Sequence, residues 1–411
     1  GSATDSHTNV AVGYGALRDN TGGSGNTALG YLTLEENISG GRNLAVGFQA
    51  LENPDTESDN LAVGYEALGG AIAGGEYNVA IGNYALDALT SADNNVAIGY
   101  QAGSAITDGG NNVLIGYQSG DAIDSGTRNT AVGVSSLSTE TGGDSNVAVG
   151  ASALVTSNGG NFNSAVGDQA LALLTTGDEN TAVGYKAGYA ATTASQSVFI
   201  GDSVCLSGQN TAGQNVYIGY EVAKANTSGD GNTVLGARAF QANTTGASNI
   251  AIGLDALDGC DAENNNLAIG QDALGGGVAG GEYNIAIGNS TLDGLTSGDK
   301  NTVLGYNAGT SLTEANNSVL VGYEAGKNIT TQNNNVCIGY QAGVGITQNN
   351  NVLIGVSAAI SAGAAAENTG VGSSVLIHLT DGTDNVAMGE SAAQNLTTGD
   401  YNTIIGSNTE P

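Results

Sequence analysis

One short pattern of hydrophobic and polar residues recurs along the whole chain. Its unit reads N-x-A-[VI]-G-Y-x-A-L, and about eight polar, Gly-rich residues follow it. The glycine of this pattern, called the anchor glycine below, occurs 24 times from Gly13 to Gly406. Most anchor glycines are 17 residues apart; three intervals are one residue longer, and one is a residue shorter. Asn stands four residues before it in 22 units, and Ser197 and Ser318 take that place in the other two. Self-similarity at a fixed period indicates a stack of similar structural units.

Each unit predicts one coil of β-structure. Seventeen residues are too few for two helices, and a glycine in every unit disfavours even one. The period of two places Val10, Val12 and Tyr14 on one face of the first strand, and Asn9 and Ala11 on the other. We expect the branched face to point inward and to stack from coil to coil, because so short a strand is stable only when neighbouring coils pair with it.

A second apolar row lies at the fourth residue after the anchor glycine. Leu in this row is expected to stack in the interior, and where Gly replaces it the core must narrow or another surface must fill it. Leu occupies the row at Leu17, Leu51, Leu68, Leu86, Leu171 and Leu257, and Gly at Gly103, Gly120, Gly188, Gly309, Gly326 and Gly343. Together the rows predict an all-β, parallel β-solenoid of 24 coils of about 17 residues.

The chain also contains a longer repeat, which comprises many of the short units. The segment from Gly70 to Tyr100, which contains GGEYNVAIGN, returns 206 positions later as GGEYNIAIGN, and one of the longer intervals between anchor glycines recurs at the same place. The chain therefore divides into a lead-in with a tag remnant at residues 1–8, a block of 12 coils at 9–214 and a second block of 12 coils at 215–411, expected to form one continuous rod.

The Asn of each unit predicts a structural ladder. Its amide both donates and accepts hydrogen bonds and it tolerates a left-handed backbone, so identical Asn side chains at one corner of stacked coils can bond from coil to coil. We expect this role, and not ligand binding, for the row that includes Asn95, Asn112, Asn129, Asn146, Asn163 and Asn180.

Composition excludes several classes of protein. The 411 residues include 67 Gly but only 4 Phe and no Trp, which does not suit a large globular core. The net charge of −31 would repel nucleic acid and anionic lipid heads, so neither is expected as a partner. Membrane insertion is not expected either, because every apolar run is too short for a membrane-spanning helix. The content of apolar residues, 40%, distinguishes the chain from disordered acidic tails.

Few residues could support chemistry. His7 lies in the opening tail and His378 in a loop, and neither belongs to a unit that breaks the repeat, so we expect no catalytic site and no cofactor. Cys205, Cys260 and Cys337 take unrelated places in their units, which disfavours zinc. Acids in Gly-Asp turns are weak candidates for Ca²⁺, although Gly-Asp is also ordinary turn chemistry: Asp144, Asp178, Asp230, Asp299 and Asp400.

Two further rows present surface chemistry. An aromatic residue follows many anchor glycines, and it either stacks on sugar rings or packs between chains and coils. This row includes Tyr100, Tyr117, Tyr306, Tyr323 and Tyr340. A row of Thr eight residues after the anchor suits a β-surface, or an ice-binding face, although adjacent pairs such as Thr175 and Thr176 are expected to point to opposite sides of a strand.

The pentapeptide carries a resemblance to a known family. NVAVG at 9–13, NVAIG at 78–82 and 95–99, and NTAVG at 129–133 and 180–184 resemble the repeats of YadA-like heads in trimeric autotransporter adhesins. The longer N-x-A-[VI]-G-Y-x-A-L form is similar to repeats of phage tail fibres and large bacterial surface proteins. The 17-residue period is longer than that of the adhesin heads.

The resemblance implies a left-handed β-roll, three chains side by side, and an extracellular fibre on a virion tail or a bacterial surface that attaches to a cell-surface receptor or glycan. For such a homotrimer we expect small-face residues such as Ala97, Ala131 and Ala182 at the chain contacts. A monomeric ice-binding or other surface-binding solenoid is the alternative.

Overall fold

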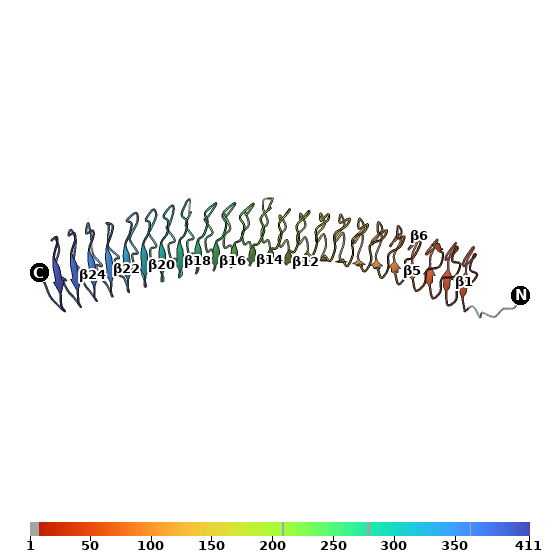
Figure 1. Ribbon diagram of the computed structural model, residues 1–411, viewed down its shortest axis with the longest axis horizontal. Helices are drawn as coiled ribbons and strands as arrows, with labels where there is room; N and C mark the ends of the chain where they lie inside the picture. Colours follow the sequence, from red (N-terminus) through yellow and green to blue (C-terminus); the bar gives the residue numbers. More distant parts are fainter. Residues whose placement is uncertain (1–7, 208, 278–279, 362) are drawn as a thin grey trace. The chain divides into compact units, whose positions relative to one another are not determined.

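The computed structural model describes residues 8–207, 209–277, 280–361 and 363–411, and these contain strands and turns but no helix. They form a parallel β-solenoid (Figure 1), which confirms the predicted all-β class and the coil as the repeating unit. The chain separates into two compact units. One comprises the described residues up to Ser203 with Gln209–Thr211, and the other the described residues of 204–208 with Ala212–Pro411. Residues 1–7 of the expected lead-in, with His7, lie outside the described residues.

Each coil of the first unit contributes one short strand to a parallel sheet. Two further strands, β4 (Asn53–Pro54) and β6 (Ala71–Ile72), pair with each other on another side of the coils. The sheet strands are β1 (Val10–Val12), β2 (Thr27–Leu29), β3 (Leu44–Val46), β5 (Leu61–Val63), β7 (Val79–Ile81), β8 (Val96–Ile98), β9 (Val113–Ile115), β10 (Thr130–Val132), β11 (Val147–Val149), β12 (Ser164–Val166), β13 (Thr181–Val183) and β14 (Val198–Ile200).

The second unit repeats this arrangement. Its strands are β15 (Val216–Ile218), β16 (Thr233–Leu235), β17 (Ile250–Ile252), β18 (Leu267–Ile269), β19 (Ile285–Ile287), β20 (Thr302–Leu304), β21 (Val319–Val321), β22 (Val336–Ile338), β23 (Val352–Ile354), β24 (Thr369–Val371), β25 (Val386–Met388) and β26 (Thr403–Ile405).

Within each unit, successive strands pair in parallel and without a shift. Val96, Ala97 and Ile98 of β8, for example, lie beside Val113, Leu114 and Ile115 of β9. Equivalent residues of successive coils therefore form straight rows, and any property of one position extends along the stack.

The faces of the strands are the reverse of the prediction. The middle residue of each strand points inward, and Ala97, Ala131 and Ala182 are fully buried, while the branched residues on either side are partly exposed. The Ala residues therefore cannot form chain contacts. The physical reason is the ladder Asn, which lies two residues before the Ala and so shares its face; burying the Asn side chain turns the Ala inward with it.

The predicted Leu row is confirmed, and it packs against the middle strand residues. Leu51, Leu68 and Leu86 are fully buried. Where Gly takes the Leu position, a larger side chain at the Ala position fills the space. A Cβ on Gly120 would lie 2.8 Å from Leu114 Cδ2 in the same coil. The interior thus keeps its volume by exchanging large and small residues between two rows.

The anchor glycine is required by close approach of the coils. Gly82 has φ +135°, and a Cβ there would lie 2.2 Å from the carbonyl oxygen of Gly99, the next anchor. No L-residue with a side chain suits both that backbone and that contact. Each anchor therefore fixes the distance between coils at the end of the strand.

Candidate functional site

The Asn row forms a buried hydrogen-bonded ladder. The backbone N–H of Asn112 donates to Asn95 Oδ1 at 2.9 Å, and Asn95 Nδ2 donates to the carbonyl oxygen of Gly109 at 3.0 Å. Both bonds join neighbouring coils, so the amide ties the strand side to the turn side of the stack. At Asn95 both ladder bonds join a side-chain amide to a backbone group, because the turn carbonyl lies within reach of Nδ2.

The other named members of the row make the same bonds. Asn180, for example, accepts from the N–H of Ser197 at 3.1 Å and donates to the carbonyl of Ala194 at 2.7 Å, and it also donates to Asn163 Oδ1 at 3.0 Å. All are fully buried: Asn95, Asn112, Asn129, Asn146, Asn163 and Asn180. The row is therefore occupied by interactions that hold the coils together.

The five aspartates considered for Ca²⁺ form a second structural row. Each lies two residues before a ladder Asn, and its Oδ1 accepts the backbone N–H of the residue 17 positions earlier at 2.7–2.9 Å: Asp144, Asp178, Asp230, Asp299 and Asp400. Asn161 and Asn316 accept the same bond in other coils. The position therefore uses a side-chain acceptor, whether or not it is charged.

Four buried glutamates escaped the sequence analysis, and two of them, Glu57 and Glu263, share one role. Glu57 and Glu263 are equivalent residues of the two blocks, 206 positions apart, and only 4% and 5% exposed. Their Oε1 atoms accept the N–H groups of Gly74 at 2.9 Å and Gly280 at 2.7 Å. Both glycines belong to coils that contain one residue more than most, so each Glu satisfies backbone that the inserted residue displaces. Only the longer repeat, which relates the two blocks, could have indicated them.

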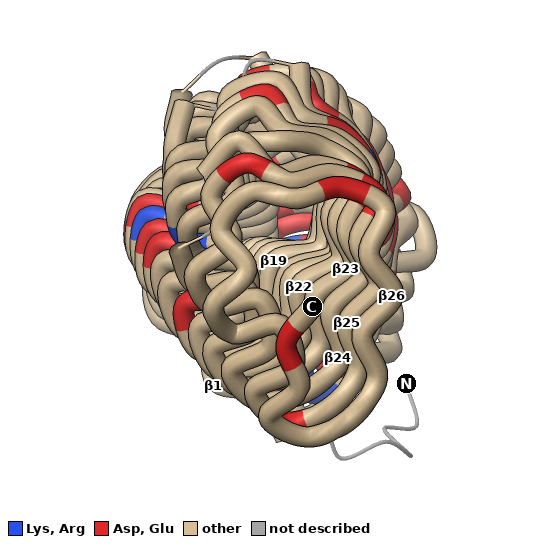
Figure 2. Tube along the Cα trace, turned by 90° about the vertical axis from the view of Figure 1, so that its left-hand side faces the viewer, with Lys and Arg blue, Asp and Glu red and all other residues tan. Residues whose placement is uncertain are grey.

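One surface keeps the same chemistry from coil to coil: the outer face of the sheet, defined as the first and third residues of each three-residue strand. These residues are Val, Ile, Leu, Thr, Ser or Met, and none of the described strands contains a charged residue. They are partly exposed, for example to 47% at Leu235, 43% at Leu304 and 39% at Val166. Figure 2 shows Asp and Glu on the turns, while strands β22–β26 carry none. An uncharged aliphatic face in a chain of net charge −31 is typical of a contact surface.

The aromatic row borders this face. Tyr14, Tyr31, Phe48 and Tyr65 stack with ring centroids 5.0–5.3 Å apart. The predicted members form two shorter stacks with centroids 5.2–5.6 Å apart and are 42–51% exposed: Tyr100 with Tyr117, and Tyr306, Tyr323 and Tyr340. Neighbouring rings cover each other's faces and leave edges exposed. Because stacking on a sugar needs a free ring face, the geometry favours packing against another protein surface.

The Thr row lies on an exposed turn and not in a strand. Thr175 and Thr176 occupy a bend, and both are exposed, so the expectation that such pairs point to opposite sides of a strand is wrong. The hydroxyl of Thr175 donates to the carbonyl oxygen of Thr192 in the next coil at 2.8 Å, and Thr90 donates likewise to that of Thr107 at 2.9 Å. These hydroxyls brace adjacent coils while remaining at the surface.

Most basic residues are neutralised within the chain. Arg42 pairs with Asp59 and Arg238 with Asp255, one coil further on, through bonds of 2.5–2.8 Å. The hydrogen bonds from Arg42 lower the pKa of the Asp59 carboxyl. Lys186 lies over the rings of two tyrosines, with Nζ 5.1 and 5.4 Å from their centroids. Within the described part of the chain, Lys300 has neither an ion pair nor an aromatic partner.

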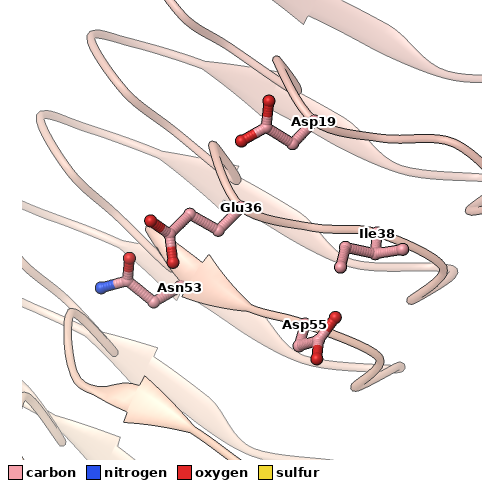
Figure 3. Close-up of a pocket in the computed structure, with 5 residues that line it drawn as sticks. All are labelled: Asp19, Glu36, Ile38, Asn53 and Asp55. Atoms are coloured by element: carbon pink, nitrogen blue, oxygen red, sulfur yellow. The ribbon is translucent and has the colours of Figure 1, made fainter.

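An acidic depression of about 300 Å³ lies on coils of the first unit. It is lined by Asp19, Glu36, Ile38, Asn53 and Asp55. In Figure 3 Asp19, Glu36 and Asn53 extend from successive coils along one side of the opening. Throughout the described residues, no group of three or more His, Cys, Asp or Glu is placed to hold a metal ion. The depression therefore gathers negative charge without forming a recognisable metal site.

The remaining reactive residues are separate from one another. Cys205, Cys260 and Cys337 are buried, and burial raises the pKa of the Cys337 thiol to about 12. Cys260 lies outside the strands and donates to Glu263 Oε2 at 3.1 Å, so it belongs with the buried carboxylate. This thiol–carboxylate contact is buried, and burial raises the pKa of the Cys260 thiol. His378 lies on an exposed turn.

The described residues include no helix with the length and apolarity that a membrane crossing requires. A comparison of the chain with protein-family models found no match, and a comparison with curated proteins found none either.

Proposed function

We propose that the chain is a non-catalytic structural and adhesive rod. It acts as the shaft or head of an extracellular fibre, on a phage tail or a bacterial surface, and attaches that fibre to a cell surface. Three parallel chains associate side by side, each coiled as a left-handed β-roll. The observation that carries the proposal is the outer face of the sheet, which is aliphatic, uncharged and partly exposed in coil after coil.

The outer face replaces the Ala residues as the contact surface of the trimer. Its Val, Ile and Leu side chains lose their remaining exposure when a second chain covers them, which favours association by the hydrophobic effect. The stacked aromatic residues at its border add large side chains that seal the groove between chains. The acidic residues lie on the turns, so they stay in water and the chains do not bring their carboxylates together.

Repetition suits attachment. Weak contacts that recur in every coil and in three chains act together once the first has formed, because the others then bind at a high effective concentration. The stability of the coils comes from internal packing and from bonds between coils that include the aspartate and threonine rows, so the other turn residues are free to vary without loss of the fold. This separation of a constant interior from variable turns is what a receptor-binding fibre requires.

A pair of substitutions in one strand tests the proposal. Ala131 is fully buried and Val132 is partly exposed. We expect Val132→Glu to leave the β-structure intact but to dissociate the trimer and to reduce retention of the fluorescently labelled chain on a panel of bacterial cells. Ala131→Glu should instead unfold the coil, because it buries a charge. Val132→Leu is the control, since Leu takes this place in other strands.

If the unmodified chain is retained on none of the cells, attachment is wrong. If Val132→Glu keeps the mass of the unmodified protein, the outer face is not the contact surface.

A monomeric ice-binding solenoid is the second candidate, favoured by one observation. Thr175 and Thr176 are both exposed on the same turn, and Thr recurs there in other coils. A regular hydroxyl array on one side of a monomer would suit an ice surface. Measurement of thermal hysteresis tests this candidate: a freezing-point gap that disappears in Thr175→Val and persists in Val132→Leu would support it.

A further inference from the structure

We propose a binding site for an uncharged glycan on the second unit, at the corner formed by Tyr283, Lys300, Asn317 and Asn334. The inference deepens the proposed attachment function and rests on it. These residues belong to the corner row, defined as the fifth residue before each anchor glycine, which immediately precedes the ladder Asn or, for Asn317, Ser318. The site lies away from the stacked aromatic row, in which neighbouring rings cover each other's faces.

The backbone of the corner row aims successive side chains out of the stack. Tyr283, Lys300, Asn317 and Asn334 all have φ between 57° and 60°. The N–H of Lys300 donates to the carbonyl oxygen of Glu282, and that of Asn317 to the carbonyl of Asp299, each at 3.0 Å. These bonds hold one corner residue above the next at the spacing of the coils. A left-handed conformation at every corner therefore gives a rigid, regularly spaced row of side chains.

Tyr283 supplies an aromatic surface of a kind that the stacked row lacks. It is 54% exposed, and no ring lies against it within the described residues. An exposed ring with a free face is the usual platform for the C–H groups of a pyranose. Its neighbours along the corner are polar, which gives the mixture of one apolar surface and several hydrogen-bonding groups that a sugar requires.

A polar depression of about 380 Å³ lies along the same corner row, on the three coils that follow the coil of Tyr283. Its lining consists of Asp299, Lys300, Asn316, Asn317, Asn333 and Asn334. Asn317 makes no side-chain hydrogen bond within the described residues, and Asn334 uses only Nδ2, which donates to Asn350 Oδ1 at 3.0 Å. Lys300 is the basic residue without an internal partner noted above. The lining thus offers unused amide donors and acceptors and one ammonium donor.

The balance of these groups indicates an uncharged ligand. Sugar hydroxyls both donate and accept, as do amides, and Lys300 and Asp299 add one strong donor and one strong acceptor side by side. An anionic ligand would meet Asp299 and the charge of −31 on the whole chain. A cationic ligand would meet Lys300. A neutral oligosaccharide lying along the coils is the ligand class that satisfies both charges.

The first block contains a natural control. The residues 206 positions earlier are Tyr77, Asn94, Asn111 and Arg128, so the aromatic platform is kept but the lysine is absent. Arg128 there is engaged, with Nε donating to Ser145 Oγ at 3.0 Å and a guanidinium nitrogen 3.7 Å from Asp144 Oδ2. The two amides at Asn316 and Asn333 correspond to a glycine and a threonine in the first block. The first corner therefore keeps the tyrosine and two amides, but it lacks the lysine, and a paired arginine stands in place of Asn334.

The experiment uses the full chain on an array of neutral oligosaccharides built from hexoses and N-acetylhexosamines, with sialylated and sulfated oligosaccharides on the same array. The strongest neutral binder is then measured by calorimetry. We expect Tyr283→Gly and Asn317→Gly each to weaken Kd at least tenfold, on the order of 1.4 kcal/mol. Gly keeps the left-handed backbone at these corners. The matched controls Tyr77→Gly and Asn111→Gly should leave Kd unchanged, and thermal melts check that all four variants fold.

Three outcomes would overturn the site: no neutral oligosaccharide binds, only sialylated or sulfated ones bind, or the matched controls weaken binding as much as the variants. Retention of the chain on bacterial cells is measured in parallel. If cells retain the chain but no neutral oligosaccharide on the array binds it, the glycan site is wrong and the attachment function stands. If a neutral glycan binds at Tyr283 but no cell retains the chain, the site stands and the attachment function fails.

Discussion

Replacement of a single ladder residue, Asn95→Ala, tests what holds the coils together. The change removes the Nδ2 donor to the Gly109 carbonyl and the Oδ1 acceptor of the Asn112 N–H, at 3.0 and 2.9 Å. Both partners lie in the fully buried corner around Asn95, so each loses a hydrogen bond that water cannot replace. A buried unsatisfied group costs about 1–3 kcal/mol, so we expect a loss of about 2–6 kcal/mol in the free energy of unfolding.

The assay is denaturation by urea and by heat, followed by circular dichroism. Asn328→Ala is the matched control, because Asn328 is exposed and has no side-chain hydrogen bond within the described structure. Because a solenoid can unfold in sections, the midpoint and the slope of the transition are both compared. A loss for Asn95→Ala no larger than that for Asn328→Ala would show that the ladder does not stabilise the stack.

Three further predictions concern the interior, calcium and pH. Leu114→Ala should cost about 2–5 kcal/mol, and adding Gly120→Leu should restore part of that loss in a double-mutant cycle, because the two positions share one volume; additive losses would contradict this. The thermal midpoint should change little between chelator and millimolar Ca²⁺, since the turn aspartates already accept backbone N–H groups; a rise of about ten degrees would make them metal sites. Burial, and after it the negative charge of Asp255, raises the pKa of Asp258 to about 6. The folded state therefore binds this proton more tightly than the unfolded state does. The contribution of Asp258 to stability should therefore fall as pH rises from about 4 to about 6, and Asp258→Asn should make the measured fall smaller in melts across this range.

The repeat alone was sufficient for the fold class, because a 17-residue period with a glycine in each unit leaves little choice but a β-coil. The inward face was predicted wrongly, although the sequence contained the means to assign it. A ladder Asn and the Ala two residues later lie on one face of the strand, and the Val between them lies on the other. If the Asn side chain is buried, the Val side chain must therefore point outward. Hydrophobicity favoured Val, but hydrogen bonding decided the orientation.

Other features depend on contacts between coils that a single unit does not reveal. The exchange of volume between Leu114 and Gly120 joins rows that lie six residues apart in sequence and meet only in the interior. The role of Glu57 depends on the N–H of Gly74 in the following coil, which an inserted residue displaces. The turn aspartates suggested calcium because the sequence shows their charge but not the backbone N–H group that each accepts.

The mass of the unmodified chain in solution, measured by light scattering at micromolar concentration, tests the central claim most directly. If two further copies cover the aliphatic outer face of each chain, the particle in solution should have a mass of about three times 40.4 kDa. The Val132→Glu variant should have the mass of one chain and the same circular dichroism spectrum. A mass of 40.4 kDa for the unmodified protein would contradict the trimer and leave the outer face without the partner proposed for it.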